Sequence, residues 1–366
     1  MKIPLANPDL GALERRSLLE AFDSGWLTSF GEKHREFEAS FAKEVGTSAS
    51  LAIGNGTQAL HLVLLGLGIG PGDKVVVPSL TYVATANAVK YVGAEPVFAD
   101  IAAETWCLDE EKIDKVISHG VKAVIVVHLY GHPAPLRDIA EYCKKKKIYL
   151  IEDVAEAPFT EAQGLKVGTV GVASTFSFYA NKVLTSGEGG AITSNDLELV
   201  ESMKQFRDQG MDRTRRYFFP IIGYNYRMTN LQAAIALVQL GRRKELIEKR
   251  LELSHFYRDE LSGIKGITMQ PIAKWANWSP WLFSILVDND IKRDSLIEHV
   301  ANQGVETRPF FIPIHTLPPY VKAKKARDLS NTVDVSKRGL NIPTWSNMPN
   351  DAARQVVSAI KSFFRI

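Results

Sequence analysis

The residue that offers the most specific chemistry is Lys182, within residues 177–190, SFYANKVLTSGEGG. It follows an apolar run typical of a buried strand and precedes a glycine-rich turn. An amine held near apolar surface has its ammonium form disfavoured, because burial penalises charge. The neutral amine is the nucleophile needed to attack an aldehyde. An exposed loop lysine is the alternative, and Lys182 taken alone would favour that interpretation.

Asp153 ends the apolar run YLIED. In an open parallel sheet, ligands bind beyond the carboxyl ends of the strands. A carboxylate at this position is suited to keep the nitrogen of a pyridine ring protonated, which is the electron-sink chemistry of pyridoxal phosphate. The alternative is a helix N-cap, with Glu156 three residues later completing a capping box.

Residues 55–60, NGTQAL, open a predicted helix directly after a predicted strand. Free backbone N–H groups at a helix start bind phosphate. Gly56 allows close approach, Thr57 adds a hydroxyl, and Ser177 can add another. Tyr82 begins a helix after the strand at 74–77, where an aromatic ring could stack on a flat cofactor. A simple helix cap and ordinary core packing remain open as alternatives for these residues.

The elements that would position these residues alternate between short strands and helices. The strand candidates are rich in Val and Ile and apolar on both faces, as buried parallel strands are. Alternation of this kind predicts an α/β fold with a mostly parallel sheet covered on both sides. The strands are expected at 74–77, 96–99, 122–128, 149–152, 174–178 and 190–194, and the helices at 57–67, 82–92, 109–118 and 136–147.

The chain is long enough for about two domains. Helices are also predicted at 12–23, 33–45, 196–209 and 229–254, and the last of these is long enough to link two domains. Beyond it the pattern is α+β, with strand candidates at 267–270, 281–286 and 306–308. We therefore expect a large domain at 1–245, which includes an N-terminal helical segment, and a small C-terminal domain at 246–366.

Composition narrows the class of protein. The net charge is +3, from 44 basic and 41 acidic residues, which argues against nucleic acid as the main partner. There are 2 cysteines, Cys107 and Cys143, which fits a reducing cytoplasm and predicts neither a disulfide framework nor a metal site. No apolar run approaches the ~18 residues that span a bilayer, so no membrane attachment is expected.

Several segments together resemble a known family. NGTQAL, PSLTYVATANAV, EDVAEA, SFYANKVLTSGEGG and GYNYRMTNLQAAIALVQL look like the sugar-nucleotide aminotransferases of the DegT/DnrJ/EryC1/StrS family. The likeness covers nearly the whole chain. It implies an aspartate-aminotransferase-like fold of type I, in which the large domain binds pyridoxal 5'-phosphate and a smaller α+β domain follows.

The resemblance also implies roles for single residues. Lys182 would form a Schiff base with the cofactor and shuttle protons, and Asp153 would pair with the pyridine nitrogen. Other cofactor contacts would come from Gly56, Thr57 and Ser177 at the phosphate, Tyr82 over the ring, Glu156 near the ring hydroxyl, and Asn225 of the partner subunit at the phosphate. A site shared in this way implies a homodimer. The candidates for substrate binding are Trp26, Arg227, Arg308 and His315, each with packing or a structural hydrogen bond as the alternative.

The implied reaction moves an amino group from L-glutamate to a nucleotide-linked ketosugar. The segments GWLTSFGEKHREFE, WLFSILVD and TRPFFIPIHTLPPY favour a GDP-linked 4-keto-6-deoxymannose as acceptor, and UDP- or dTDP-linked ketosugars are the alternatives. A dehydratase of the same family would have histidine in place of Lys182. Two departures from the family pattern are Val172, where an acidic residue is common, and residues 158–160, where small residues are usual.

Overall fold

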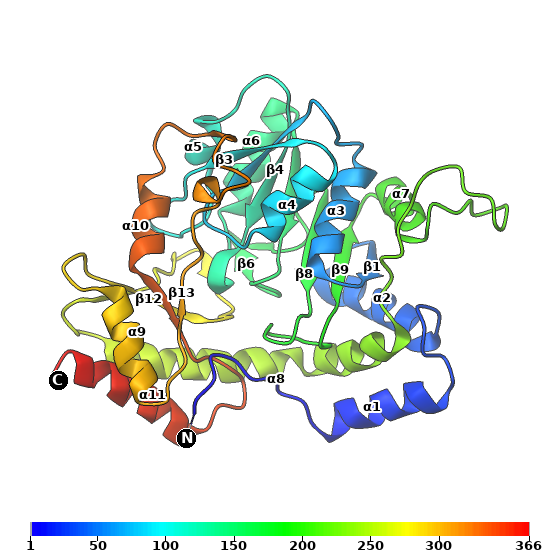
Figure 1. The fold of residues 1–366 in the computed structure, drawn as a ribbon. Helices are drawn as coiled ribbons and strands as arrows, with labels where there is room; N and C mark the ends of the chain where they lie inside the picture. Colours follow the sequence, from blue (N-terminus) through cyan, green and yellow to red (C-terminus); the bar gives the residue numbers. More distant parts are fainter. Residues whose placement is uncertain (1, 366) are drawn as a thin grey trace.

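The structure is a computed structural model, and it describes residues 2–365. Its largest element is an 8-stranded sheet (Figure 1). Neighbours from β8 to β14 run parallel, whereas β9 is antiparallel to both β8 and β1. The strand order is β1 (Ala49–Ile53), β9 (Gly190–Ser194), β8 (Ala173–Ser177), β5 (Tyr149–Asp153), β4 (Val121–Val127), β2 (Lys74–Pro78), β3 (Glu95–Ala99) and β14 (Lys324–Lys325).

The two faces of this sheet form two separate cores, because successive side chains of a strand point to opposite faces. In β4, Ala123 and Ile125 lie in one core, and Val124 and Val126 lie in the other. The first core includes side chains of α3 (Gly56–Gly66), α4 (Ala84–Tyr91) and α7 (Leu197–Arg207). The second includes α2 (Glu32–Val45), α5 (Glu110–Asp114) and α6 (Leu136–Lys146). The predicted α/β fold with a mostly parallel, two-sided sheet is confirmed.

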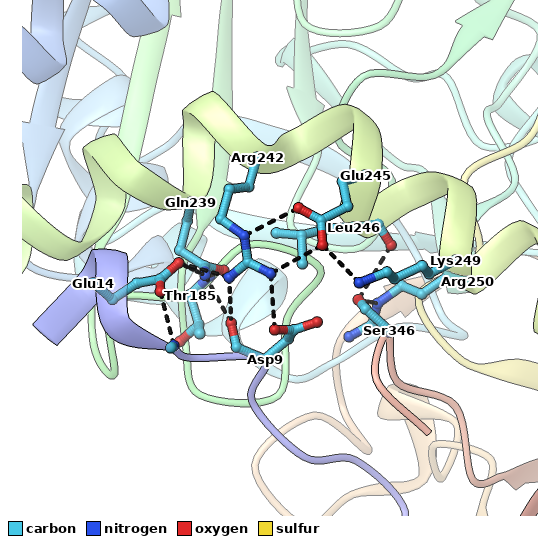
Figure 2. A network of polar contacts seen from close by, with 11 residues as sticks. Asp9, Glu14, Thr185, Gln239, Arg242, Glu245, Leu246, Lys249, Arg250 and Ser346 are labelled. Carbon is cyan, nitrogen blue, oxygen red and sulfur yellow. Dashed lines mark hydrogen bonds and ion pairs between the residues drawn. The ribbon is translucent and has the colours of Figure 1, made fainter. Parts of the chain in front are cut away.

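A long helix, α8 (Asn230–Leu261), crosses beneath the sheet, with α1 (Ala12–Asp23) beside its first half (Figure 1). Figure 2 shows how the N-terminal segment is held to it. The Arg242 guanidinium pairs with Glu14 Oε1 at 2.8 Å and with Asp9 Oδ1 at 2.9 Å. Gln239 donates to the same Glu14 oxygen at 2.8 Å and accepts the N–H of Thr185, in the turn between β8 and β9, at 3.3 Å.

The C-terminal elements gather at the other end of α8 around a third core (Figure 1). An antiparallel sheet there has the order β10 (Ile267–Met269), β12 (Phe283–Val287), β15 (Gly339–Ile342) and β13 (Arg308–Pro309). The helices α9 (Arg293–Asn302) and α11 (Asn350–Phe363) pack in this core, whereas α10 (Ser330–Arg338) contributes Val335 to the second core. A third, small sheet has the order β11 (Ala276–Asn277), β6 (Glu161–Ala162) and β7 (Leu165–Lys166). There are also two 3-10 turns in the described chain, η1 (Leu129–Gly131) and η2 (Ile314–Thr316).

Differences from the sequence prediction concern short elements and the C-terminal part, where α9, α10, α11 and β15 were not predicted individually. The helix expected at 109–118 is only α5. Of the two-residue strands, β13 overlaps the strand expected at 306–308, and the others were missed because so short a strand carries no periodicity. The helix expected at 82–92 begins at Ala84, which leaves Tyr82 in the preceding loop. The boundary expected at 245/246 falls inside α8, and it stays a prediction. Within residues 2–365, no helix has both the length and the apolar character that crossing a bilayer requires.

Candidate active site

A cavity of about 610 Å³ lies beyond the carboxyl ends of β5 and β8, whose last residues are Asp153 and Ser177. This position follows from the topology, because the carboxyl ends of parallel strands meet at one edge of the sheet. Eight of the residues singled out from the sequence line this cavity: Gly56, Thr57, Tyr82, Asp153, Glu156, Ser177, Lys182 and Arg308.

Lys182 lies in the turn between β8 and β9, where its N–H donates to Tyr179 O at 2.9 Å. Its side chain is only 13% exposed, and Nζ is 3.9 Å from Glu156 Oε1. Nζ also lies 3.6 Å from the centre of the Trp281 ring. Burial lowers the pKa of Lys182, and the carboxylates of Glu156 and Asp153 only partly oppose this. The site therefore shifts this amine toward its neutral, nucleophilic form.

Asp153 is buried, and both of its oxygens accept hydrogen bonds. Oδ2 accepts from the Thr85 hydroxyl at 2.9 Å, and Oδ1 accepts from the Ala155 N–H at 3.2 Å. Burial raises the pKa of Asp153, and these two donors and Lys182 oppose the rise. The segment after Asp153 is not helical, so the capping box considered as an alternative does not form.

Glu156 instead bonds across the cavity wall. Its Oε2 accepts the N–H of Tyr130 at 2.9 Å. Tyr130 has a φ of 52°, a left-handed conformation that costs a bulky residue about 1–2 kcal/mol and is kept only where the surroundings impose it. Burial raises the pKa of Glu156 to about 7, and Lys182 opposes the rise. The carboxyl group beside Lys182 is therefore more easily protonated than an exposed one.

The start of α3 forms a small cradle beside Ser177. Asn55 caps the helix, since its Oδ1 accepts the Gln58 N–H at 2.9 Å. The N–H groups of Gly56 and Thr57 belong to the first turn and have no partner within the helix, which makes them donors for an anion. A Cβ added at Gly56 would lie 3.1 Å from Ser177 Cβ, so a side chain at this position would crowd Ser177. The cavity thus fits a flat ring that carries an aldehyde, a basic nitrogen and a phosphate.

Four other residues singled out from the sequence are not among the residues that line this cavity. Trp26 is 59% exposed and borders a second hollow near Phe30. Arg227 lies 4.6 Å from the Phe30 ring and 3.4 Å from Asn225 Oδ1. His315 is buried, and its Nδ1 is 2.7 Å from the Ser79 hydroxyl, which is the structural hydrogen bond considered as its alternative.

The cavity also contains residues that the sequence reasoning missed. Trp281 and Phe311 come from the C-terminal part, and His61 of α3 lies with Tyr91 of α4 and Tyr226 in an aromatic wall. The sequence held only a weak signal for Trp281, because an indole at the edge of an apolar strand is typical of core packing. Its proximity to Lys182 depends on contacts between distant parts of the chain.

Comparison with known proteins gives consistent results. The sequence pattern of the DegT/DnrJ/EryC1/StrS aminotransferase family matches residues 8–361. GDP-perosamine synthase of Vibrio cholerae is 40% identical over 369 residues, which is 99% of each chain. GDP-perosamine synthase of Escherichia coli O157:H7 is 38% identical over 362 residues, 99% of this chain and 98% of the relative.

Solved structures agree with these relatives. The aminotransferase TlmJ from Streptoalloteichus hindustanus superposes with a TM-score of 0.93 at 30% identity, over 98% of each chain. Helicobacter pylori PseC, an aminotransferase involved in the biosynthesis of pseudoaminic acid, superposes with a TM-score of 0.94 at 27% identity, over 100% of this chain and 99% of that one. The chain therefore belongs to the DegT/DnrJ/EryC1/StrS aminotransferase family, whose members in general depend on pyridoxal phosphate, and it is a sugar aminotransferase.

Proposed function

We propose that the chain transfers an amino group from L-glutamate to C4 of GDP-4-keto-6-deoxy-D-mannose, which yields GDP-perosamine. The acceptor is supported by the GDP-perosamine synthases that are 38% and 40% identical to this chain over nearly their whole length. The observation that carries the reaction type is the burial of Lys182 in one cavity with Asp153.

Pyridoxal phosphate bound in the cavity would supply an electron sink for the carbanion that an amino acid leaves when it loses its α-proton. Asp153 would hold the ring nitrogen protonated. The N–H groups of Gly56 and Thr57 and the Ser177 hydroxyl would bind the phosphate. Tyr82 would cover the ring, and its side chain, which is 59% exposed, would lose contact with water.

Lys182 would carry the proton between the reacting carbon atoms. As a neutral amine it would take the α-proton of glutamate, and as an ammonium it would hold that proton for the carbon on the other side of the transferred nitrogen. The same group would work in reverse on the ketosugar. Glu156, which faces Lys182 Nζ at 3.9 Å, would stabilise the ammonium between these two steps. Arg308 at the cavity wall would contact the anionic substrate.

We further propose that the active unit is a homodimer in the cytoplasm. Asn225 and Arg227 lie outside the cavity of their own chain and would serve the cavity of the other. The segment between α7 and α8 projects from the body (Figure 1) and exposes Tyr217 by 72% and Ile222 by 88%, as an unpaired interface would. The free, buried Cys107 and Cys143 fit a reducing compartment.

The test is to incubate the purified protein with glutamate and a panel of GDP-, UDP- and dTDP-linked ketosugars, and to weigh the products. A product from the GDP sugar whose mass shows an amino group and a hydrogen in place of the keto oxygen supports the proposal. Amination of only a UDP or dTDP sugar would replace the acceptor with that sugar. A Lys182→Ala variant that still turns over at the normal rate would overturn the assignment of Lys182.

A further inference from the structure

The turn that carries Lys182 is held by side chains from far along the chain. The Lys182 N–H donates to Tyr179 O at 2.9 Å, and the carbonyls of Asn181 and Lys182 accept donors from side chains elsewhere in the chain. Trp281 Nε1–H donates to Asn181 O at 2.7 Å. The Arg250 guanidinium lies 3.5 Å from Lys182 O. Side chains from the C-terminal half thus reach both carbonyls that flank Cα of residue 182.

Arg250 also holds Trp281 itself. Its Nη1 donates to Trp281 O at 2.8 Å and to Thr344 O at 3.1 Å, and its Nε donates to Ser346 Oγ at 3.2 Å. Figure 2 shows this side chain on α8 with Ser346. Burial lowers the pKa of Arg250 to about 10, so it is charged at neutral pH. A planar guanidinium with several acceptors is fixed in direction, and the main chain at Trp281 is fixed with it.

The Trp281 ring contacts both the Lys182 amine and Tyr130, and Tyr130 is in turn bonded to Glu156 beside the amine. The ring is 3.6 Å from Lys182 Nζ and stacks on Tyr130, with 6.2 Å between ring centres and 24° between planes. The Tyr130 N–H bonds to Glu156 Oε2 at 2.9 Å, and Glu156 Oε1 faces Lys182 Nζ at 3.9 Å. The ε-amine is therefore bounded by an indole face on one side and by a carboxyl group on another.

Trp278, in the same segment, is a buried tryptophan for comparison with Trp281. Trp278 is as buried as Trp281, at 6% against 3% exposure. Its Nε1 nevertheless has no hydrogen-bond partner within the described residues. The directed bond from Trp281 to the peptide next to Lys182 is therefore not a general consequence of burying an indole.

We propose that Trp281 and Arg250 are positioning residues for Lys182. Trp281 fixes the main chain of Lys182 and limits the water and the space around its amine, while Arg250 fixes Trp281. The inference rests on the proposed function, because it concerns the alignment of the amine that reacts there. Alignment matters because a displacement of about 1 Å at a reacting group can cost about 100-fold in rate.

The first test is Trp281→Phe, which keeps an aromatic face but removes the N–H that Asn181 O accepts. We expect kcat to fall about tenfold, the upper range for one lost hydrogen bond, while KM for each substrate changes less than about twofold. Trp278→Phe is the matched control, because it removes an indole N–H that bonds to nothing in the described chain. Its kcat should equal that of the wild type.

A second readout does not depend on turnover. The full-length protein freed of cofactor is treated with acetic anhydride at pH 8, and acetylation of Lys182 is followed by peptide mass. A smaller ring leaves more room for the anhydride beside Nζ, and phenyl stabilises an ammonium less than the indole face that lies 3.6 Å from Nζ. Acetylation should therefore speed up about threefold in Trp281→Phe and stay unchanged in Trp278→Phe. Equal rates in all three proteins would overturn the proposal.

Arg250→Lys gives an independent variant should Trp281→Phe fail to fold. Lysine keeps the charge but cannot reach several acceptors at once, so kcat should fall and the acetylation rate should rise, as in Trp281→Phe. Arg258→Lys, on the same helix, is its control. Normal, Lys182-dependent turnover and normal acetylation in Arg250→Lys would refute this inference alone. A protein that is active without Lys182 would refute the proposed function, and this inference with it.

Discussion

The Asp153→Asn substitution removes one buried charge and hardly changes the shape of the side chain. Asp153 accepts two hydrogen bonds, from the Thr85 hydroxyl and the Ala155 N–H. Only one of the two terminal atoms of asparagine can accept, so one of these donors loses its acceptor. A lost bond to a buried charged group destabilises the fold by about 2 kcal/mol. This is less than the 5–15 kcal/mol that typically separates folded from unfolded protein, so the variant should fold.

The effect on catalysis should be larger than the effect on stability. An amide cannot hold a pyridine nitrogen in its protonated form, so the charge that develops in the reaction loses its counterpart. We expect kcat to fall by about 10²–10³-fold, which corresponds to about 3–4 kcal/mol of lost transition-state stabilisation. The assay measures amino transfer from glutamate to the ketosugar, and urea unfolding measures stability in parallel.

Asp100→Asn is the matched control. Asp100 directly follows β3, is 3% exposed, and accepts the N–H groups of Thr332 at 2.8 Å and Asn331 at 3.3 Å. It is not among the residues that line the cavity. We expect a similar loss of stability and an unchanged kcat. Wild-type kcat in Asp153→Asn, or an equal loss of kcat in both variants, would refute the reasoning.

Three further predictions concern the same cavity. Burial raises the pKa of Glu156 to about 7, so its carboxyl is neutral below that pH and charged above it. Glu156→Gln should therefore remove an ionisation near pH 7 from the pH profile of kcat/KM. A variant whose profile keeps this ionisation would contradict the assignment. Gly56→Ala places a methyl group 3.1 Å from Ser177 Cβ. It should weaken cofactor binding about tenfold in a spectroscopic titration without loss of stability. Gly241→Ala is the control: its Cβ has open space, so it should raise the free energy of unfolding by about 1 kcal/mol and leave cofactor binding unchanged. Arg308→Ala should raise KM for the nucleotide sugar about tenfold and change kcat less than about twofold, and steady-state kinetics showing the reverse would remove Arg308 from substrate binding.

The sequence alone was sufficient to predict the large sheet and the residues at its edge. Strands buried on both faces are recognisable from continuous Val and Ile runs, and the residues that follow such strands meet at one edge for topological reasons. Asp153, Ser177 and the start of α3 therefore converge in the structure as expected. Lys182 was placed by the same argument, because the turn that carries it directly follows a strand of that sheet.

The tertiary structure alone decided which distant side chains surround that lysine. Trp281 and Arg250 lie in segments whose local patterns indicate only an apolar strand and a long helix, and neither pattern records which peptide their polar atoms will reach. Likewise, Glu156 fits the spacing of a helix cap in the sequence but bonds to Tyr130 in the fold. Local sequence determines the elements and the groups at their ends, whereas the partners of buried polar atoms depend on packing between elements that are far apart in the chain.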